Sequence, residues 1–402
     1  MWSNHIIQVH WEPTDKCNSA CPMCPRYTHD GFELPTLSNV EWTLESFKAA
    51  WPVEFLQRID KILACGNFGD PCACKEFSDI YTYVREINPN IRLCLNTNAS
   101  LRNTDWWVKL AKVVDHDSCS GNYCTFSIDG LEDTNHLYRR NTNWKKIMEN
   151  ATAFIEAGGV AHWDFIVFEH NEHQVEEARE LARSMGFKNF NVKRTTRFHK
   201  YEEGVGVHEV MWKGKHIYDI KQASDAKFKE NFEDSTYFKQ SKYQSFRPED
   251  FNKMVGATNL SKKLVGGEMK TIRLNDLSVG CRSVKGARPD ASYDEIFVSA
   301  NGLVAPCCYL GSEPHKVGSV SWVDENYMKM VELNGGIDTI NMHKHNLYDI
   351  LQTDLFQKFI PASWNENKSM MPAKCGQCCG LEFNIIDAGE TGDKRNSYFE
   401  EK

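Results

Sequence analysis

Short apolar runs alternate with longer amphipathic stretches through the first 200 residues of the chain. The runs have the length of buried strands, and the stretches repeat their apolar positions every three or four residues, as helices do. Gly158 and Gly159 follow one stretch and Gly186 follows another, as C-terminal helix caps do. The predicted strands cover residues 6–11, 59–64, 91–96, 123–128, 163–168 and 190–193.

Two of the predicted helices show a clear apolar face. Six strand–helix alternations predict parallel βα units. Six are too few for a closed eight-stranded barrel, so we expect a partial (β/α)6 TIM-like barrel over residues 1–200. Chemistry in such a barrel collects at the C-terminal ends of the strands. The faces consist of Trp144, Ile147, Met148, Ala151, Phe154 and Ile155, and of Val175, Ala178, Leu181, Ala182 and Met185.

The pattern changes after residue 200. Residues 201–272 are polar and charged, with Lys213-Gly214-Lys215 and a charged run over 227–234, and are interpreted as an insertion, linker or lid. Residues 273–385 predict a small α+β domain. Within it Asn301-Gly302 joins two apolar runs, which is a strong signal for a β-hairpin over residues 295–308. Residues 386–402 form a charged tail.

Composition narrows the class of protein. The net charge is −8 and the hydrophobic content 41%, which suits a globular protein and argues against a basic surface that coats nucleic acid. No apolar run has the roughly 18 to 20 residues of a membrane span. The N-terminus does not resemble a signal peptide, so we expect a cytoplasmic protein with reduced thiols.

Fifteen cysteines then need an explanation, and most occur in groups, which in a reducing compartment favours metal ligation over disulfides. Cys17, Cys21 and Cys24 have the spacing C-x3-C-x2-C directly after the first predicted strand. Three close thiolates suit a [4Fe-4S] cluster with one iron free of protein ligands. The alternative is a zinc knuckle or buried thiols, although C-x3-C is unusual for zinc ribbons.

This triplet, placed after a first strand, resembles the signature of the radical S-adenosylmethionine (SAM) superfamily. The resemblance implies that the open iron chelates the amino and carboxylate groups of SAM. Many members have an aromatic residue before the third cysteine, where this chain has Met23, which is also large and apolar.

Further segments match the family in order over residues 5–200. Gly66-Asn67-Phe68-Gly69-Asp70-Pro71 resembles the Gly-Gly-Glu-Pro segment whose carbonyls accept from the SAM amino group, although Asn67-Phe68 intrudes and an ordinary turn is the alternative. Asn96-Thr97-Asn98 follows the third predicted strand, where relatives often carry Thr-Asn-Gly. Ser127-Ile128-Asp129-Gly130 ends the fourth strand and resembles the Ser-x-Asp-Gly of the peptide- and sugar-modifying branch. Arg139 or Arg140 could pair with the SAM carboxylate, or begin a solvated helix. The implied SAM contacts are Gly66, Asn67, Gly69, Asp70, Asn98, Ser127, Arg139 and Arg140.

The C-terminal cysteines resemble the twitch domain, the shortened form of the SPASM extension, which holds one auxiliary [4Fe-4S] cluster. Zinc is the alternative for four thiolates. Cys308 or Cys379 could replace its neighbour as a ligand. The implied ligands are Cys281, Cys307, Cys375 and Cys378.

The remaining chemical groups are ambiguous. We expect Cys65, Cys72 and Cys74 to pack, and Cys94, Cys119 and Cys124 to be strand or core residues. Residues 169–173 and the basic run 193–197 could contact SAM or an anionic substrate group, or could be solvated loops.

The resemblance implies reductive cleavage of SAM to a 5′-deoxyadenosyl radical, with a flavodoxin or ferredoxin-like electron donor. We expect oxidation of a small polar metabolite or a peptide side chain, with epimerisation or carbon–carbon bond formation as the second choice. A hypothesis of another class is a non-catalytic zinc or iron-sulfur binding module.

Overall fold

One twisted sheet organises the molecule. The computed structural model describes residues 6–114, 121–195, 197–198, 200–202, 205–225, 228, 260–265, 268–273, 281, 283, 294–316, 323–365 and 368–379. The sheet has the strand order β13-β12-β1-β2-β3-β4-β5-β6, and every neighbouring pair is parallel except β12 and β13. The strands are β1 Ile6–Trp11, β2 Lys61–Ala64, β3 Arg92–Thr97, β4 Tyr123–Ser127, β5 Ala161–Ile166, β6 Asn189–Lys193, β12 Asp294–Val298 and β13 Val304–Ala305.

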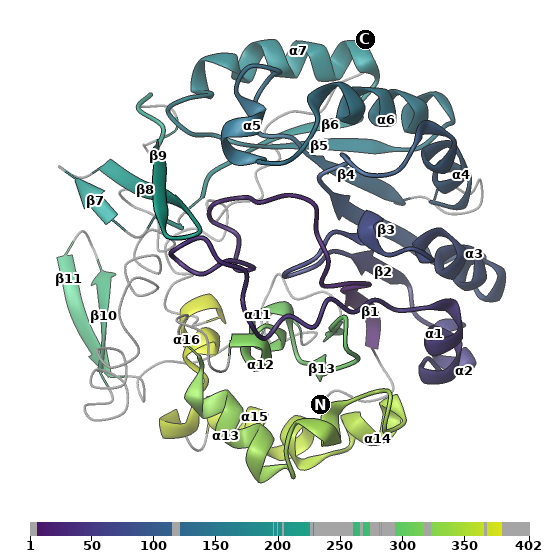
Figure 1. Cartoon of the computed structure of the whole chain (residues 1–402). Helices are drawn as coiled ribbons and strands as arrows, with labels where there is room; N and C mark the ends of the chain where they lie inside the picture. The colour runs from purple at the N-terminus through teal and green to yellow at the C-terminus, as the bar shows by residue number, and fades with distance from the viewer. Residues whose placement is uncertain are drawn as a thin grey trace.

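The helices between these strands lie along the outer side of the curved sheet, so the predicted partial barrel is confirmed (Figure 1). Gly158 and Gly186 have the positive φ of helix-ending glycines, whereas Gly159 does not. Gly159 is instead required because a Cβ there would lie 2.4 Å from the ring of Phe154. The elements are α1 Leu44–Ala50, α2 Val53–Leu56, η1 Pro71–Ala73, α3 Phe77–Ile87, α4 Thr104–Val114, α5 Asn135–Tyr138, α6 Trp144–Glu156, η2 Glu172–Gln174 and α7 Val175–Met185.

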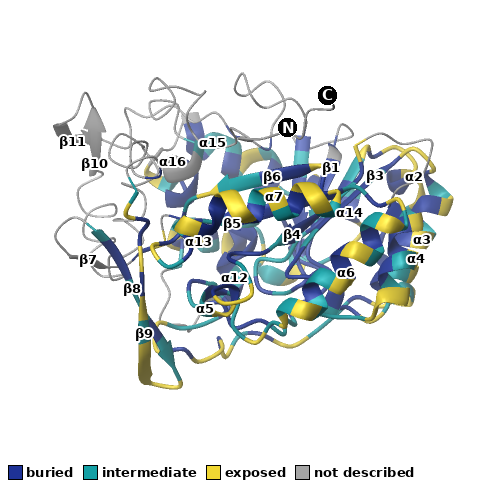
Figure 2. Ribbon diagram, turned by 90° about the horizontal axis from the view of Figure 1, so that it is seen from above, coloured by how far each residue is buried: buried dark blue, intermediate teal, exposed yellow. Residues whose placement is uncertain are grey.

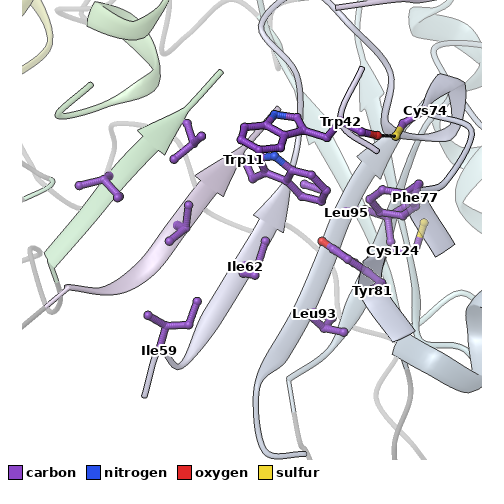
Figure 3. Packing of buried hydrophobic residues seen from close by; sticks show 14 of the residues in the cluster. Trp11, Trp42, Ile59, Ile62, Cys74, Phe77, Tyr81, Leu93, Leu95 and Cys124 are labelled. Carbon is purple, nitrogen blue, oxygen red and sulfur yellow. Dashed lines mark hydrogen bonds between the residues drawn. The ribbon is translucent and has the colours of Figure 1, made fainter. Parts of the chain in front are cut away.

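Aromatic side chains fill the space between the sheet and these helices (Figure 3). Trp11 at the end of β1 contacts Phe47 of α1, with ring centroids 5.2 Å apart, and also Phe77 and Tyr81 of α3. Each of these four side chains is fully buried. Burial of a large aromatic side chain contributes roughly 1.5–3 kcal/mol, so this cluster fixes the strand that leads into the cysteine loop.

The predicted C-terminal hairpin is present, but it extends the barrel sheet. Strand β12 runs parallel to β1, with Val9 opposite Ile296, and β13 pairs antiparallel with β12. The sheet therefore continues across the predicted boundary at residue 273.

Short helices follow the hairpin and pack beside β1 and β12 at the bottom of the view in Figure 1. They bury Tyr327, Met330, Leu355 and Phe356 in the same core as the barrel. These elements are α11 Cys308–Gly311, α12 Glu313–Lys316, α13 Glu325–Leu333, η4 Ile337–Ile340, α14 Leu347–Leu351, η5 Leu355–Phe359, α15 Ile360–Asn365, η6 Lys368–Met370 and α16 Ala373–Cys379.

The polar segment after residue 200 contains strands where it is described. Lys213 and Gly214, both with positive φ, form the turn between β8 and β9. Most residues of β9 are exposed (Figure 2). The charged run over 227–234 (Phe228 apart), the tail 386–402 and Cys119 lie outside the described residues. No described helix is long and apolar enough to cross a membrane. The strands are β7 Lys200–Glu202, β8 Val205–Trp212, β9 Lys215–Lys221, β10 Leu260–Val265 and β11 Glu268–Arg273.

Candidate active site

The cysteine triplet lies on the long loop between β1 and α1, which crosses the mouth of the barrel (Figure 1). Cys21 is buried, and Cys17 and Cys24 are half-buried. The backbone N–H of Ser19 donates to Cys17 Sγ over 3.4 Å, and the Ser19 hydroxyl lies 3.0 Å from Cys21 Sγ. Burial raises the pKa of Cys24 to about 11. Iron ligation needs the thiolate, so a bound cluster would oppose this shift.

Apolar side chains shield one side of the triplet. Met23 is 6% exposed and belongs to a small cluster with Cys21, Tyr138, Phe168 and Phe198. The Met23 side chain thus occupies a protected position beside the cysteines, as the sequence indicates. Hydrophobic surroundings of this kind restrict solvent access to a metal centre.

The second segment lies directly against the cysteine loop. A Cβ at Gly69 would lie 1.8 Å from the carbonyl oxygen of Thr14, so only glycine permits this approach. Asp70 accepts from the N–H groups of Cys72 and Asn98 and from the Thr97 hydroxyl. Asp70 therefore ties the second segment to the end of β3.

The third segment reaches the cysteines themselves. The Asn98 side-chain amide is 3.8 Å from Cys17 Sγ and 3.0 Å from Asn18 Oδ1. The predicted SAM contact Asn98 is therefore adjacent to a predicted cluster ligand. Hydrogen bonds to cysteine sulfur stabilise the negative charge of a cluster.

The fourth segment contributes a buried ion pair. Asp129 is fully buried and its Oδ2 accepts from Arg139 Nε over 2.5 Å. Arg139 Nη1 also lies 3.7 Å from Cys21 Sγ. Arg140 instead places its guanidinium 4.9 Å from the Trp212 ring of β8, and half-buried Ser127 ends β4. A SAM-carboxylate contact by either arginine stays a prediction.

The other polar candidates lie at the same end of the barrel. Lys193 forms a 2.5 Å ion pair with Asp164 across β5 and β6, and Arg197 donates to the Met23 carbonyl over 3.3 Å. Asn171 is buried and its side chain donates to the Asp129 carbonyl, so it supports the fold. Cys72, Cys74, Cys94 and Cys124 are fully buried, as expected of packing residues, and Cys65 is partly exposed.

The C-terminal cysteines come together from three distant segments. A hydrogen bond with Cys379, together with burial, raises the pKa of the Cys281 thiol, and Cys307 and Cys375 add to the effect. Burial raises the pKa of Cys375, and the neighbouring thiols of Cys379 and Cys307 raise it further. The structure thus places Cys379, the alternative ligand, against Cys281. The side chain of Cys378 lies outside the described residues.

The two cysteine groups are connected through the second segment. The Asn67 side chain donates to the Cys308 carbonyl over 2.8 Å. The neighbouring Phe68 ring contacts His315, with centroids 5.2 Å apart. The intruding pair Asn67-Phe68 therefore contacts the segment that carries Cys307.

The arrangement of the possible ligands can be compared with what a single metal ion needs. In the described part of the chain, no three His, Cys, Asp or Glu side chains are arranged to hold a metal ion. This bears on single ions only, because a four-iron cluster is larger and separates its thiolates more widely than one ion with bonds of about 2.3 Å.

Two residues near the triplet escaped prediction from sequence. Arg26 donates to the carbonyls of Asp15 and Phe68, and joins the cysteine loop to the second segment. Glu12 accepts from the backbone N–H groups of Phe68 and Gly69. Arg26 lies two positions after Cys24, and Glu12 directly follows the first predicted strand. Their closeness to these features is the sequence signal that could have identified them.

Three cysteines at the C-terminal edge of a parallel partial barrel, with a second cysteine group beside it, suit iron-sulfur ligation. The sequence matches the radical SAM superfamily over residues 11–182 and the SPASM iron-sulfur cluster-binding domain over residues 290–379. The chain belongs to the radical SAM superfamily and carries a SPASM-type domain. Its radical SAM domain binds SAM and a [4Fe-4S] cluster, and its SPASM domain binds iron-sulfur clusters.

Several solved structures are similar to this chain at low sequence identity. SuiB of Streptococcus suis bound to precursor peptide SuiA is 12% identical, with TM-score 0.48 over 88% of this chain and 66% of SuiB. Native anSMEcpe with bound AdoMet is 14% identical, with TM-score 0.47 over 89% and 84% of the two chains. BtrN in complex with AdoMet and 2-DOIA is 11% identical, with TM-score 0.38 over 91% and 89%. The chain spans about two thirds of the length of SuiB, and no curated protein matches it in sequence.

Proposed function

We propose that this protein reductively cleaves SAM and abstracts hydrogen from a small polar metabolite or a peptide side chain, giving an oxidised product. The observation that carries the proposal is the convergence of three further segments on the cysteine loop. Gly69 approaches Thr14, Asn98 contacts Cys17, and Arg139 contacts Cys21.

Each of these residues has a defined task in the proposal. Cys17, Cys21 and Cys24 hold a [4Fe-4S] cluster, which supplies the electron that converts SAM to methionine and a 5′-deoxyadenosyl radical. Asn98 and Arg139 stabilise the ligating sulfurs through hydrogen bonds. The predicted SAM contacts are Gly66, Asn67, Gly69, Asp70, Asn98, Ser127, Arg139 and Arg140.

The side chains of Asn67, Asp70, Asn98 and Arg139 already bond within the fold. For Asn67 the proposed contact with the SAM amino group is therefore the backbone carbonyl, and the Asp70 carbonyl also accepts from the Ala73 N–H.

The second cluster belongs to the C-terminal cysteines. Cys281, Cys307 and Cys375 are three proposed ligands, and the predicted fourth is Cys378. The hydrogen bond between Cys281 and Cys379 favours Cys379 for that position. This cluster would accept an electron from the substrate radical or help to bind substrate, and a flavodoxin or ferredoxin-like donor would reduce the first cluster.

A reducing, cytoplasmic setting suits this chemistry. Cys17, Cys21 and Cys24 are free thiols. Disulfides are rare where glutathione and thioredoxin keep thiols reduced, and free thiolates are what iron ligation needs.

Anaerobic reconstitution tests the proposal. We expect about eight irons per chain, from two four-iron clusters, and 5′-deoxyadenosine after dithionite reduction. Replacing Cys17, Cys21 and Cys24 with Ala should remove about half of the iron and abolish cleavage. Cys94→Ala, a change in a buried core thiol, is the matched control and should alter neither.

The alternatives predict different results. A non-catalytic zinc or iron-sulfur binding module produces no 5′-deoxyadenosine even when it is replete with iron. An epimerase or bond-forming enzyme cleaves SAM as well, so product analysis with a substrate must separate it from an oxidase. Zinc bound at Cys375 would exclude the auxiliary cluster.

A further inference from the structure

Glu12 connects the first strand to the SAM-binding segment. It follows β1 directly, and it is fully buried. Its Oε1 accepts from the backbone N–H of Phe68 over 2.7 Å and of Gly69 over 3.1 Å. The N–H of Asn67 is near enough to attract the carboxylate weakly. One oxygen of Glu12 therefore fixes the segment that would receive the SAM amino group.

The second oxygen of Glu12 has no such partner. Oε2 is buried and makes no hydrogen bond with any described residue. A buried carboxylate without a counter-charge is costly, and burial raises the pKa of Glu12 to about 7. Another acid, Asp15, raises the pKa of Glu12 further. A cation at Oε2 would remove this penalty.

The acid within the segment itself cannot fill this role. Both oxygens of Asp70 are engaged, by the Cys72 and Asn98 N–H groups and by the Thr97 hydroxyl. Asp15 Oδ1 is also buried without a hydrogen-bond partner, but the other Asp15 oxygen bonds to Ser38 and Asn39, outside the segment. Glu12 is thus the buried carboxylate that both bonds to the amides of the segment and retains an oxygen for a ligand.

SAM brings its positive sulfonium and the N–H groups of its amino group to this place. We propose that Glu12 Oε2 either faces the sulfonium of bound SAM or accepts a hydrogen bond from its amino group, so that Glu12 both holds the Gly66–Pro71 segment and balances ligand charge. The inference rests on the proposed SAM site. It adds a binding residue from β1 to the segments that the sequence identifies.

The test is SAM affinity of the anaerobically reconstituted, oxidised protein, measured by isothermal titration calorimetry. Glu12→Gln keeps an oxygen for the Phe68 and Gly69 amides but removes the negative charge. We expect about 10- to 100-fold weaker SAM binding, the range of a charge-assisted hydrogen bond, with unchanged iron content. A loss smaller than threefold would overturn the proposal, because a purely structural brace survives this substitution.

Glu295→Gln is the matched control. Glu295 is a largely buried carboxylate on the adjacent strand β12, opposite Gln8, and thus about 13 Å along the sheet from Glu12. It should leave SAM affinity unchanged. An equal loss in both variants would assign the effect to the charge of the barrel as a whole and overturn a direct contact.

S-Adenosylhomocysteine separates the two contacts, because it has the amino group but no sulfonium charge. A contact with the amino group weakens both ligands equally in Glu12→Gln, and a contact with the sulfonium weakens only SAM. If Glu12→Gln loses iron, Glu12→Asp provides a second test because it retains the charge. With affinity expressed per assembled cluster, Glu12→Asp should bind SAM more tightly than Glu12→Gln. Equal affinities of the two variants would refute the proposal. Wild-type protein that binds no SAM would instead refute the proposed function.

Discussion

The buried pair of Asp129 and Arg139 should respond unequally to removal of either partner. The Asp129 carboxylate is 0% exposed, and it accepts from Arg139 Nε over 2.5 Å and from the Ile166 N–H over 2.6 Å. Burial opposes the charge on Arg139, but Asp129 outweighs it and raises the Arg139 pKa. Asp129→Asn thus leaves a guanidinium that cannot lose its proton.

The cost follows from that asymmetry. Breaking a buried ion pair by removing one partner destabilises a protein by about 3–5 kcal/mol. Asp129→Asn should reach this range. Arg139→Met should cost less, because burial already raises the pKa of Asp129 and the orphaned carboxyl can be neutralised by a proton. The double variant should recover most of the loss.

Anaerobic thermal unfolding of the cluster-loaded protein, followed by tryptophan fluorescence, measures these differences. At roughly 2–4 °C per kcal/mol for a unit of 150–250 residues, Asp129→Asn should lower Tm by about 10 °C. Arg139→Met should lower Tm by clearly less at pH 6 than at pH 8, where the carboxyl is harder to protonate. Equal losses in the two single variants, or additive losses in the double variant, would show that the pair does not act as a unit.

Three further outcomes are expected. Gly69→Ala places a Cβ 1.8 Å from the Thr14 carbonyl oxygen, so it should weaken SAM binding and lower the free energy of unfolding by about 1–3 kcal/mol through overpacking. Unchanged SAM affinity and unchanged Tm would contradict the close approach. Because the folded-state pKa of Glu12 is raised from 4.5 to about 7, the folded protein binds the extra proton in that window, so stability should fall as pH rises from 4.5 to 7, by up to about 3 kcal/mol relative to Glu12→Gln in urea titrations without SAM. Cys379→Ala should remove about half of the iron and leave the first cluster intact, whereas full iron content would return the fourth ligand position to Cys378.

Local patterns in the sequence predicted what depends on local physics. The parallel strands follow from apolar runs, and the site at their ends follows from the position of Cys17 after the first run. Gly186 closes its helix with φ of +88° because glycine tolerates that region. The ends of the six predicted barrel strands differ from the observed ends by at most two residues, since hydrogen-bond pairing and not hydrophobicity decides where a strand stops.

Contacts between residues far apart in the sequence could not be predicted from local patterns. Glu12 meets Phe68 across 56 positions, and Arg26 meets Phe68 across 42. Neither residue has a local pattern that demands a partner. Strand β12 was predicted as part of a hairpin, but its pairing with β1 was not, because strand order depends on the whole chain and both orders satisfy the same local pattern.

The departure of the second segment from the family pattern has a structural reason. Where the family has a second glycine, the chain has Asn67-Phe68. The Asn67 side chain donates to the Cys308 carbonyl, and the Phe68 ring packs on His315. A glycine at either position has no side chain to make these contacts. The same segment is held from the barrel side by Glu12 and Arg26. The sequence feature that departs from the family pattern is therefore the one that contacts the segment carrying Cys307, through one hydrogen bond and one ring contact.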